Sequence, residues 1–269
     1  MEFVTLNTGV EIPMIGTGTN TYGKQDHNYN GDITGDTTEL DAAIASGYRL
    51  IDTAIGYRNE AVIGAAVKKS GLDRSEFFLT SKLPGKEEYT ASREAVEAGI
   101  AFSLEQLQTD YIDLYLIHHP WDDLDEIVSV WKVLEEYVDK GVFKAIGVSN
   151  FDEKQLQYLL DNARIEPAVN QIQSHVGHWN HEVIAFGKQH GIVSEAWGPL
   201  SGVSDEARVK LTEIGKSYNK SWAQVSLRYQ IQSGVVVIPK SHDAGRQKDN
   251  LELFDFELTA EEMAEVAAL

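Results

Sequence analysis

Short apolar runs alternate with longer amphipathic stretches along almost the whole chain. The apolar runs have the length of buried strands, and the longer stretches carry apolar residues at helical spacing. Strands that alternate with helices are typical of βαβ units and a parallel sheet. The predicted strands are 14–19, 48–51, 76–81, 111–117, 142–148, 168–172, 192–196 and 235–238. The predicted helices are 37–45, 60–69, 91–107, 124–140, 154–162, 181–190, 206–218, 221–232 and 260–268.

Eight such strands in 269 residues, with no linker between them, favour a closed (β/α)8 TIM barrel over an open sheet. We therefore expect a single barrel domain over residues 1–269. Residues 3–13 form two β-rich runs around an Asn-Thr-Gly turn, which predicts a β-hairpin that closes the barrel bottom. Asp36 precedes the first helix and is predicted to be its N-cap.

The stretch 47–60 places a carboxylate, Asp52, directly after a short apolar run, and a phenol, Tyr57, in the loop that follows. Barrel chemistry takes place at the carboxyl ends of the strands, so both side chains are candidates for one site. The alternative is structural: Asp52 as a helix cap and Tyr57 as a rim residue. This stretch alone leaves the two interpretations about equal.

Most of the other predicted strands also end on a polar or aromatic residue. These residues are Lys82, His118, Ser149, Asn150, Gln171, Trp197 and Lys240. A lysine near a phenol favours the phenolate and so lowers its pKa from about 10. A carboxylate holds the lysine, and an imidazole orients a substrate oxygen. Such a set can protonate an oxygen that becomes an alkoxide, as carbonyl reduction requires.

Six motifs in chain order carry a resemblance to a known family. They are DTAxxYxNE at 52–60, TSKLP at 80–84, DLYLIHxP at 113–120, GVSNF at 147–151, PAVNQIQ at 167–173 and IPKS at 238–241. On these motifs the sequence resembles the aldo-keto reductase superfamily, in particular its short bacterial members that include diketogluconate reductases. The resemblance implies reversible, NADPH-dependent reduction of aldehydes and ketones by a cytoplasmic monomer.

The resemblance also implies roles for individual residues. Tyr57 corresponds to the general acid, Lys82 to the partner that lowers its pKa, Asp52 to the carboxylate that pairs with the lysine, and His118 to the residue that orients the carbonyl. The implied contacts of NADPH/NADP+ are Gly18, Thr19, Ser149, Asn150, Gln171, Trp197, Leu200, Lys240, Ser241, Arg246 and Asn250. The last four, from Lys240 to Asn250, lie where barrels bind phosphate, and the resemblance implies that they bind the adenosine 2′-phosphate.

Four residues are candidates for the substrate pocket: Asn20, Tyr22, His119 and Trp121. The alternatives are that His119 only fills space and that the other three pack at the rim. His118 and His119 are adjacent, and strand geometry would point them to opposite sides. The polar segment 22–37 is long for a loop inside a compact domain, and we expect it to cover part of the substrate entrance.

The composition narrows the possible partners. A net charge of −19 repels phosphate backbones and argues against nucleic acid, so an anionic cofactor needs a locally basic pocket. No stretch has the length of a membrane span, and no signal peptide is expected. Cysteine is absent, which fits a cytoplasmic protein. His175, His178 and His181 are spaced by three, but no carboxylate joins them, and we expect no metal.

Two other functions remain open from the sequence. A nicotinamide-binding regulatory subunit could use the same barrel without turnover, although the complete set Asp52, Tyr57, Lys82 and His118 favours an enzyme. An unrelated barrel that enolises phosphosugars would require a carboxylate base and would leave GVSNF and PAVNQ unexplained.

Overall fold

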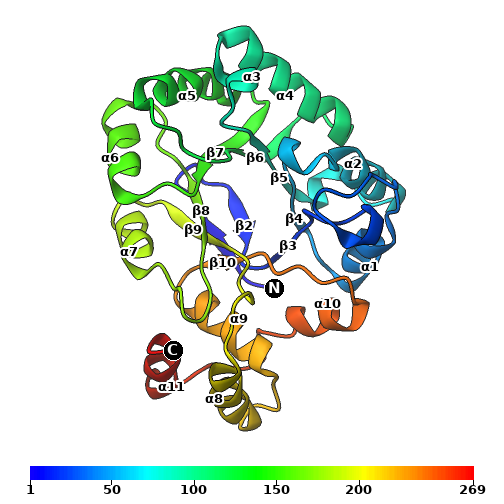
Figure 1. Ribbon diagram of the computed structural model, residues 1–269, viewed down its shortest axis with the longest axis vertical. Coiled ribbons are helices and arrows are strands. Elements are labelled where there is room, and N and C mark those ends of the chain that lie inside the picture. The colour runs from blue at the N-terminus through cyan, green and yellow to red at the C-terminus, as the bar shows by residue number, and fades with distance from the viewer.

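The computed structural model describes all residues 1–269, and its centre is a ring of eight parallel strands surrounded by helices (Figure 1). The strands are β3 (Gly16–Gly18), β4 (Leu50–Asp52), β5 (Phe78–Leu83), β6 (Ile112–Ile117), β7 (Phe143–Ser149), β8 (Val169–Gln173), β9 (Val193–Trp197) and β10 (Val236–Val237). Each strand pairs in parallel with the next one along the chain.

The first and last strands of this order also meet, and they close the ring. Ile15 forms a parallel bridge with Val237, whose N–H donates to the carbonyl of Met14 at 3.0 Å. The N–H of Gly18 donates to the carbonyl of Pro239 at 3.3 Å. The predicted (β/α)8 barrel is confirmed.

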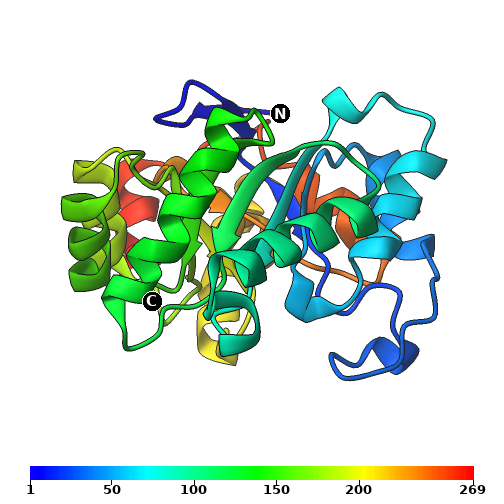
Figure 2. The same ribbon diagram turned by 90° about the horizontal axis from the view of Figure 1, so that it is seen from above.

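An antiparallel hairpin precedes the barrel, formed by β1 (Phe3–Thr5) and β2 (Glu11–Pro13). Ile12 is fully buried, and the amide of Asn7 donates to the carbonyl of Pro167 at 3.1 Å. Figure 2 shows the hairpin at the end of the barrel opposite to the long loops. The predicted hairpin at the barrel bottom is therefore confirmed.

The helices form the outer layer. Nine of them follow the predicted bounds within a few residues, whereas the helices at 87–90 and 244–251 are not among the predicted ranges. The helices are α1 (Thr38–Ser46), α2 (Glu60–Lys69), α3 (Glu87–Thr90), α4 (Arg93–Leu107), α5 (Leu124–Asp139), α6 (Glu153–Asn162), α7 (His181–Gln189), α8 (Asp205–Lys216), α9 (Trp222–Gln232), α10 (Ala244–Leu251) and α11 (Ala260–Ala267). Three single 3₁₀ turns lie at η1 (Gln25–His27), η2 (Ile55–Tyr57) and η3 (Arg74–Glu76). None of the helices combines the length and apolar character that a membrane crossing needs.

Two local predictions were wrong. The N-cap of α1 is Thr37 rather than Asp36, although the Asp36 carboxylate accepts a hydrogen bond from the N–H of Thr38 at 2.9 Å. The third barrel strand was expected to end at residue 81, but β5 continues to Leu83. Lys82 therefore lies inside a strand, where its backbone pairs with Leu116 of β6.

Close contact between β7 and β8 depends on Gly147. A Cβ atom at this position would lie 2.5 Å from the carbonyl oxygen of Val169, which is backbone and cannot rotate away. We expect Gly147→Ala to lower the free energy of unfolding by about 1–3 kcal/mol, because overpacking displaces the strand. Urea unfolding at neutral pH measures the change.

Gly245→Ala on the exposed start of α10 is the matched control, since its Cβ would approach only the carboxylate of Asp243, at 3.1 Å. This control should stay within about 0.5 kcal/mol of the parent chain. Equal stability of the two variants would contradict the packing role of Gly147.

Candidate active site

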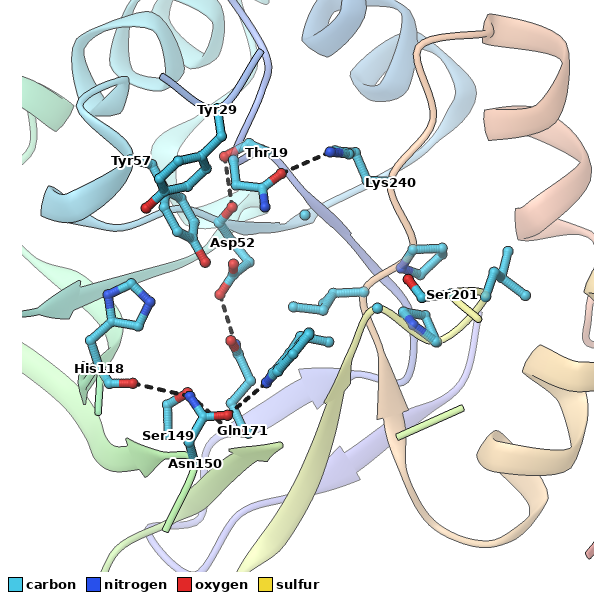
Figure 3. A pocket seen from close by; sticks show the side chains of 18 of the residues that line it. Thr19, Tyr29, Asp52, Tyr57, His118, Ser149, Asn150, Gln171, Ser201 and Lys240 are labelled. Carbon is cyan, nitrogen blue, oxygen red and sulfur yellow. Dashed lines mark hydrogen bonds between the residues drawn. The ribbon is translucent and has the colours of Figure 1, made fainter. Parts of the chain in front are cut away.

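A cavity of about 480 Å³ opens at the carboxyl ends of the strands (Figure 3). It lies among the loops at the end of the barrel away from the hairpin, where barrels carry their functional groups. Its lining residues come from seven of the eight strand ends and the loops that follow them. They are Gly18, Thr19, Asn20, Tyr29, Asp52, Tyr57, His118, His119, Ser149, Asn150, Gln171, Trp197, Gly198, Pro199, Leu200, Ser201, Ile238, Pro239 and Lys240.

An ion pair lies beneath the cavity floor. The Nζ of Lys82 on β5 is 2.7 Å from Oδ1 of Asp52 on β4, and their side chains are 0% and 2% exposed. Nζ also donates to the carbonyl of Thr53 at 2.9 Å. The second carboxylate oxygen of Asp52 accepts from the amide of Gln171 on β8 at 2.8 Å. Burial of two charges is tolerated here because each has several partners.

Tyr57 is the third hydrogen-bond partner of Lys82. Its hydroxyl lies 3.2 Å from Nζ of Lys82, which is 4.7 Å from the centre of the phenol ring. The residue ends the 3₁₀ turn η2, and Arg58 then turns the chain with a left-handed φ of 62°. The turn brings the phenol back over the end of β5. Figure 3 shows its hydroxyl at the cavity wall, between Asp52 and His118.

His118 lies directly after β6, and its ring meets Tyr57 edge to face, with 5.5 Å between the centroids. The neighbouring His119 does not point to the opposite side, as strand alternation had predicted. The two imidazole rings stack, with centroids 4.2 Å apart and planes at 13°. Strand alternation ends at Ile117, so the two side chains are free to project to the same side.

Burial dominates the acid–base properties of the phenol. The sequence predicted a lowered pKa for Tyr57, but burial raises its pKa to about 12, and the nearby Lys82 ammonium offsets only part of this rise. For Lys82 itself burial lowers the pKa, yet the Asp52 carboxylate and Tyr57 reverse that effect and leave the pKa raised. At neutral pH the pair is therefore a protonated phenol held against an ammonium ion.

The two histidines are neutral for the same reason. Burial lowers the pKa of His118 to about 2, and the Lys82 ammonium and His119 add to this effect. Burial and Lys82 also lower the pKa of His119. A neutral imidazole carries one N–H, so His118 can donate a hydrogen bond to a substrate oxygen without carrying charge.

Three polar side chains lie together at the ends of β7 and β8, and we call them the polar shelf: Ser149, Asn150 and Gln171. Ser149 Oγ donates to the carbonyl of Gln171 at 3.0 Å, and the Asn150 N–H donates to the same carbonyl at 2.8 Å. The Asn150 amide nitrogen donates to the carbonyl of His118 at 3.3 Å, and its oxygen accepts from the indole of Trp197 at 2.8 Å. Asn150 has a left-handed φ of 61°, a strained conformation that often marks a functional position.

The first loop of the barrel completes the floor. Thr19 Oγ1 donates to the carbonyl of Asp52 at 2.7 Å, and Asn59 holds the carbonyl of Thr19 at 2.7 Å. A Cβ on Gly18 would lie 3.2 Å from the carbonyl oxygen of Ile238. The glycine therefore allows the first barrel strand to lie close to the backbone that follows β10.

Lys240 supplies a cation at the rim of this cavity. Its Nζ donates to Asn20 Oδ1 and to Thr21 Oγ1, both at 2.9 Å, and it makes no ion pair. An ammonium with only neutral partners suits an anionic ligand. Ser241, Arg246 and Asn250, implied to bind the same cofactor, do not line the cavity and lie on the following loop and α10.

Only two of the four residues expected to form the substrate pocket line the cavity. Asn20 and His119 line the cavity, but Tyr22 and Trp121 do not. Tyr22 is buried and donates to the carbonyl of Ser241 at 2.8 Å, so it supports the loop after β10. The indole of Trp121 donates to Glu126 at 3.1 Å, at the start of α5.

Tyr29 and Glu195 were not found from the sequence. Tyr29 reaches the cavity from the 22–37 segment and lies edge-on to Tyr57, with 6.1 Å between the ring centroids. Glu195 on β9 is fully buried, and neither carboxylate oxygen has a hydrogen-bond partner. Burial, with Asp52 nearby, raises its pKa to about 8. A carboxylate inside the apolar run of β9 was the signal for Glu195, whereas nothing in a polar loop singles out Tyr29.

Of the histidines spaced by three, His175 and His178 pair through their backbones and their ring centroids lie 5.7 Å apart, but the ring nitrogens of His175 and His181 have other partners. Nδ1 of His175 lies 2.8 Å from the carbonyl of Val176, and its Nε2 lies 3.1 Å from the amide of Gln173. Nε2 of His181 lies 3.2 Å from the hydroxyl of Tyr229.

Comparison with known proteins connects this geometry with a family. A family model described as the Aldo/keto reductase family matches residues 14–269. A glyoxal reductase of Bacillus subtilis (strain 168) is 41% identical over 269 residues, which is 100% of this chain and 92% of that protein. A 2,5-diketo-D-gluconic acid reductase B of Corynebacterium sp. (strain SHS752001) is 38% identical, covering 99% of this chain and 92% of that protein.

Solved structures agree with these relatives. An aldo/keto reductase from Brucella melitensis matches with a TM-score of 0.90 and 34% identity, covering 99% of this chain and 98% of that one. A Bombyx mori aldo-keto reductase in complex with NADP matches with a TM-score of 0.88 and 31% identity, covering 99% of this chain and 92% of that one.

The neutral state of His118 makes stability depend on pH. Its pKa is about 2 in the folded chain, against 6.5 ordinarily, so between these values the unfolded chain binds a proton that the folded chain does not. The free energy of unfolding is therefore unaffected by this group above pH 6.5, and it falls on acidification below that pH by about 1.4 kcal/mol per pH unit. Urea unfolding at several pH values between 6.5 and 5 should show a steeper loss for the parent chain than for His118→Gln. Parallel losses in the two proteins would contradict a neutral, buried His118.

Proposed function

The chain belongs to the aldo/keto reductase family, an oxidoreductase family, and we propose that it reduces aldehydes and ketones to alcohols with NADPH, reversibly. The observation that carries the proposal is the contact of Tyr57, Lys82 and Asp52 beneath one cavity, with His118 beside the phenol. These are the parts needed to protonate a carbonyl oxygen while its carbon is reduced.

The proton comes from Tyr57. Its phenol is protonated at neutral pH, and its hydroxyl stands at the cavity wall next to His118. As the proton leaves, negative charge develops on the phenolate oxygen, and the Lys82 ammonium 3.2 Å away stabilises it. Asp52 keeps this ammonium in place and charged. His118 donates its one N–H to the carbonyl oxygen and so orients it toward the phenol.

A nicotinamide cofactor, when bound, supplies the hydride. The residues present fit such a group, because the cavity combines hydrogen-bonding side chains with an aromatic ring and an unpaired cation. We assign the carboxamide to the polar shelf of Ser149, Asn150 and Gln171, and the ring face to Trp197. Gly18, Thr19 and Leu200 line the same cavity and would flank the cofactor.

The phosphate end of NADPH is assigned to the region after β10. Lys240 has no ion pair there, and α10 begins at Ala244 with its N-terminus toward this loop. A helix N-terminus favours negative charge. Ser241, Arg246 and Asn250 are proposed to hold the adenosine 2′-phosphate and the adenine. The NADP complex of the Bombyx mori relative supports the choice of cofactor.

We propose small, polar carbonyl compounds as substrates. Asn20, Tyr29 and His119 give the cavity a polar wall beside Tyr57. The names of two relatives, glyoxal reductase and 2,5-diketo-D-gluconic acid reductase B, support dicarbonyl compounds and keto-sugars. A panel of aldehydes, α-dicarbonyls, β-keto esters and keto-sugars, run with NADPH and with NADH, tests the function. Failure of the whole panel to oxidise either cofactor would overturn it.

Replacement of Tyr57 by phenylalanine tests the proton donor. Tyr57→Phe removes the hydroxyl but keeps the ring, so kcat should fall by about 10²–10⁴-fold while the Kd for NADPH changes little. Stopped-flow or steady-state oxidation of NADPH gives kcat, and fluorescence titration gives the Kd. Tyr137→Phe on the outer helix α5 is the control and should turn over normally. Normal turnover by Tyr57→Phe would refute the mechanism.

Replacement of Lys240 by methionine tests the proposed binding of the cofactor phosphate. Lys240→Met removes a hydrogen bond to a charged group, which contributes about 1.5–3 kcal/mol, so KM for NADPH should rise about 10–100-fold. KM for NADH should change much less. Lys248→Met, an exposed lysine on α10, controls for general loss of positive charge. Equal effects of Lys240→Met on the two cofactors, or equal kcat/KM for them in the parent chain, would contradict the assignment.

A further inference from the structure

Outside the cavity, three side chains from distant parts of the sequence converge on one point. His27 comes from the 22–37 segment, Glu39 from the first turn of α1, and His242 from the loop between β10 and α10. None of them lines the cavity, and the proposed reaction does not use them. This is the one cluster in the chain that could offer three metal-binding side chains.

The donor atoms face one another closely. Nδ1 of His27 lies 2.9 Å from Oε1 of Glu39, and Nδ1 of His242 contacts the same carboxylate oxygen. One donor atom from each of the three residues lies within 4.8 Å of the others. The two imidazole centroids are 3.9 Å apart, with the planes tilted by 46°. Two ring nitrogens and a carboxylate oxygen thus surround one small volume.

The surrounding structure holds these side chains in place. Asp26 and His27 both adopt a left-handed backbone, with φ of 54° and 52°, which costs energy for residues other than glycine. This conformation turns the His27 ring toward His242. Glu39 is only 14% exposed. Nε2 of His242 lies 3.0 Å from Thr21 Oγ1, and a hydrogen bond of this kind typically orients a histidine that ligates a metal through its other nitrogen.

We propose that His27, Glu39 and His242 bind a divalent transition metal ion, with Zn²⁺ as the best match. Two imidazoles and one carboxylate are the ligands of three-residue zinc sites, in which water takes the fourth position. Mg²⁺ and Ca²⁺ prefer sites made of oxygen atoms, so the two nitrogens select against them. The exposed side of His27 gives the ion and its water a path from solvent.

Binding at this site would join three segments near the cavity. The 22–37 segment carries Tyr29, which lines the cavity beside Tyr57. Thr21, the partner of His242, accepts a hydrogen bond from Lys240 at 2.9 Å. The metal therefore fixes the segment that carries one wall of the cavity to the loop that carries its cation.

Isothermal titration of the untagged full chain with Zn²⁺ tests the site, in a buffer that does not chelate metals. We expect one equivalent to bind. His27→Gln, Glu39→Gln and His242→Gln should each weaken binding at least about tenfold, because even the loss of an outer-shell partner costs about 10–100-fold in metal affinity. His178→Gln, an exposed histidine on another loop, is the matched control and should bind as the parent chain does.

A second measurement reports on the segment itself. Tyr29 is 43% exposed, and its peptide bond is a cleavage site for chymotrypsin. Zn²⁺ should slow cleavage after Tyr29 in the parent chain and in His178→Gln, but not in His27→Gln. Circular dichroism confirms that each variant is folded, and the exposed position of His27 makes that variant the safest.

Absence of stoichiometric Zn²⁺ binding by the parent chain would overturn the proposal, as would equal binding by all four variants. In that case the cluster is a pair of histidines hydrogen-bonded to one carboxylate. The outcome is independent of the reductase activity, because binding and cleavage are measured without cofactor or substrate.

Discussion

A buried ammonium ion sets the requirements for the whole site. Lys82 is fully enclosed at the end of β5, and a charge in that position is tolerated only with close partners. Asp52 and the carbonyl of Thr53 supply two of them from the neighbouring strand, and Tyr57 supplies the third. Asp52 in turn is held by Gln171 across the barrel. The ion pair therefore fixes the relative positions of β4, β5 and β8.

Such a pair adds little to stability, because desolvation offsets most of its Coulomb attraction. Burial is the main reason why the surrounding groups are uncharged, and the pair adds to it. Burial lowers the pKa of His118, with a smaller contribution from the Lys82 ammonium, and burial raises the pKa of Glu195, with a smaller contribution from the Asp52 carboxylate. Apart from Lys240 at the rim, the site thus has one cation and one anion, in contact. In the proposed reaction the Lys82 ammonium stabilises the charge that develops on Tyr57, and the Asp52 carboxylate offsets part of this effect.

Position along the strands made the central part of the site predictable from sequence. Carboxyl ends of neighbouring parallel strands meet at one barrel face, so Asp52, Lys82 and His118 could be placed together from their strand endings alone. Their net electrostatics could not, because the pKa of Tyr57 depends on how completely the phenol is buried, and burial here outweighs Lys82.

The positions of loop side chains were harder to predict from the sequence, because they also depend on the folded structure. The direction of a loop side chain follows from tertiary contacts, and no period in the sequence records them. Tyr22 turns inward to the loop after β10, Tyr29 reaches the cavity, and His119 stacks on His118 because the strand has already ended. The prediction succeeded for residues at strand ends, where the geometry repeats from strand to strand. It failed for loop residues, whose side chains are each placed by their own tertiary contacts.

The overall charge of −19 does not exclude an anionic cofactor, because the local arrangement of ion pairs matters more. Screening in physiological salt limits the field of distant carboxylates to about 8 Å. Most buried or half-buried cations pair with acidic neighbours, as Arg74 does with Asp113 and Arg228 with Glu2. Lys240 at the cavity rim has only neutral partners. The absence of an ion pair at Lys240 therefore supports the proposed anionic ligand at the cavity rim, whereas the net charge mainly argues against partners that would need a broad basic face.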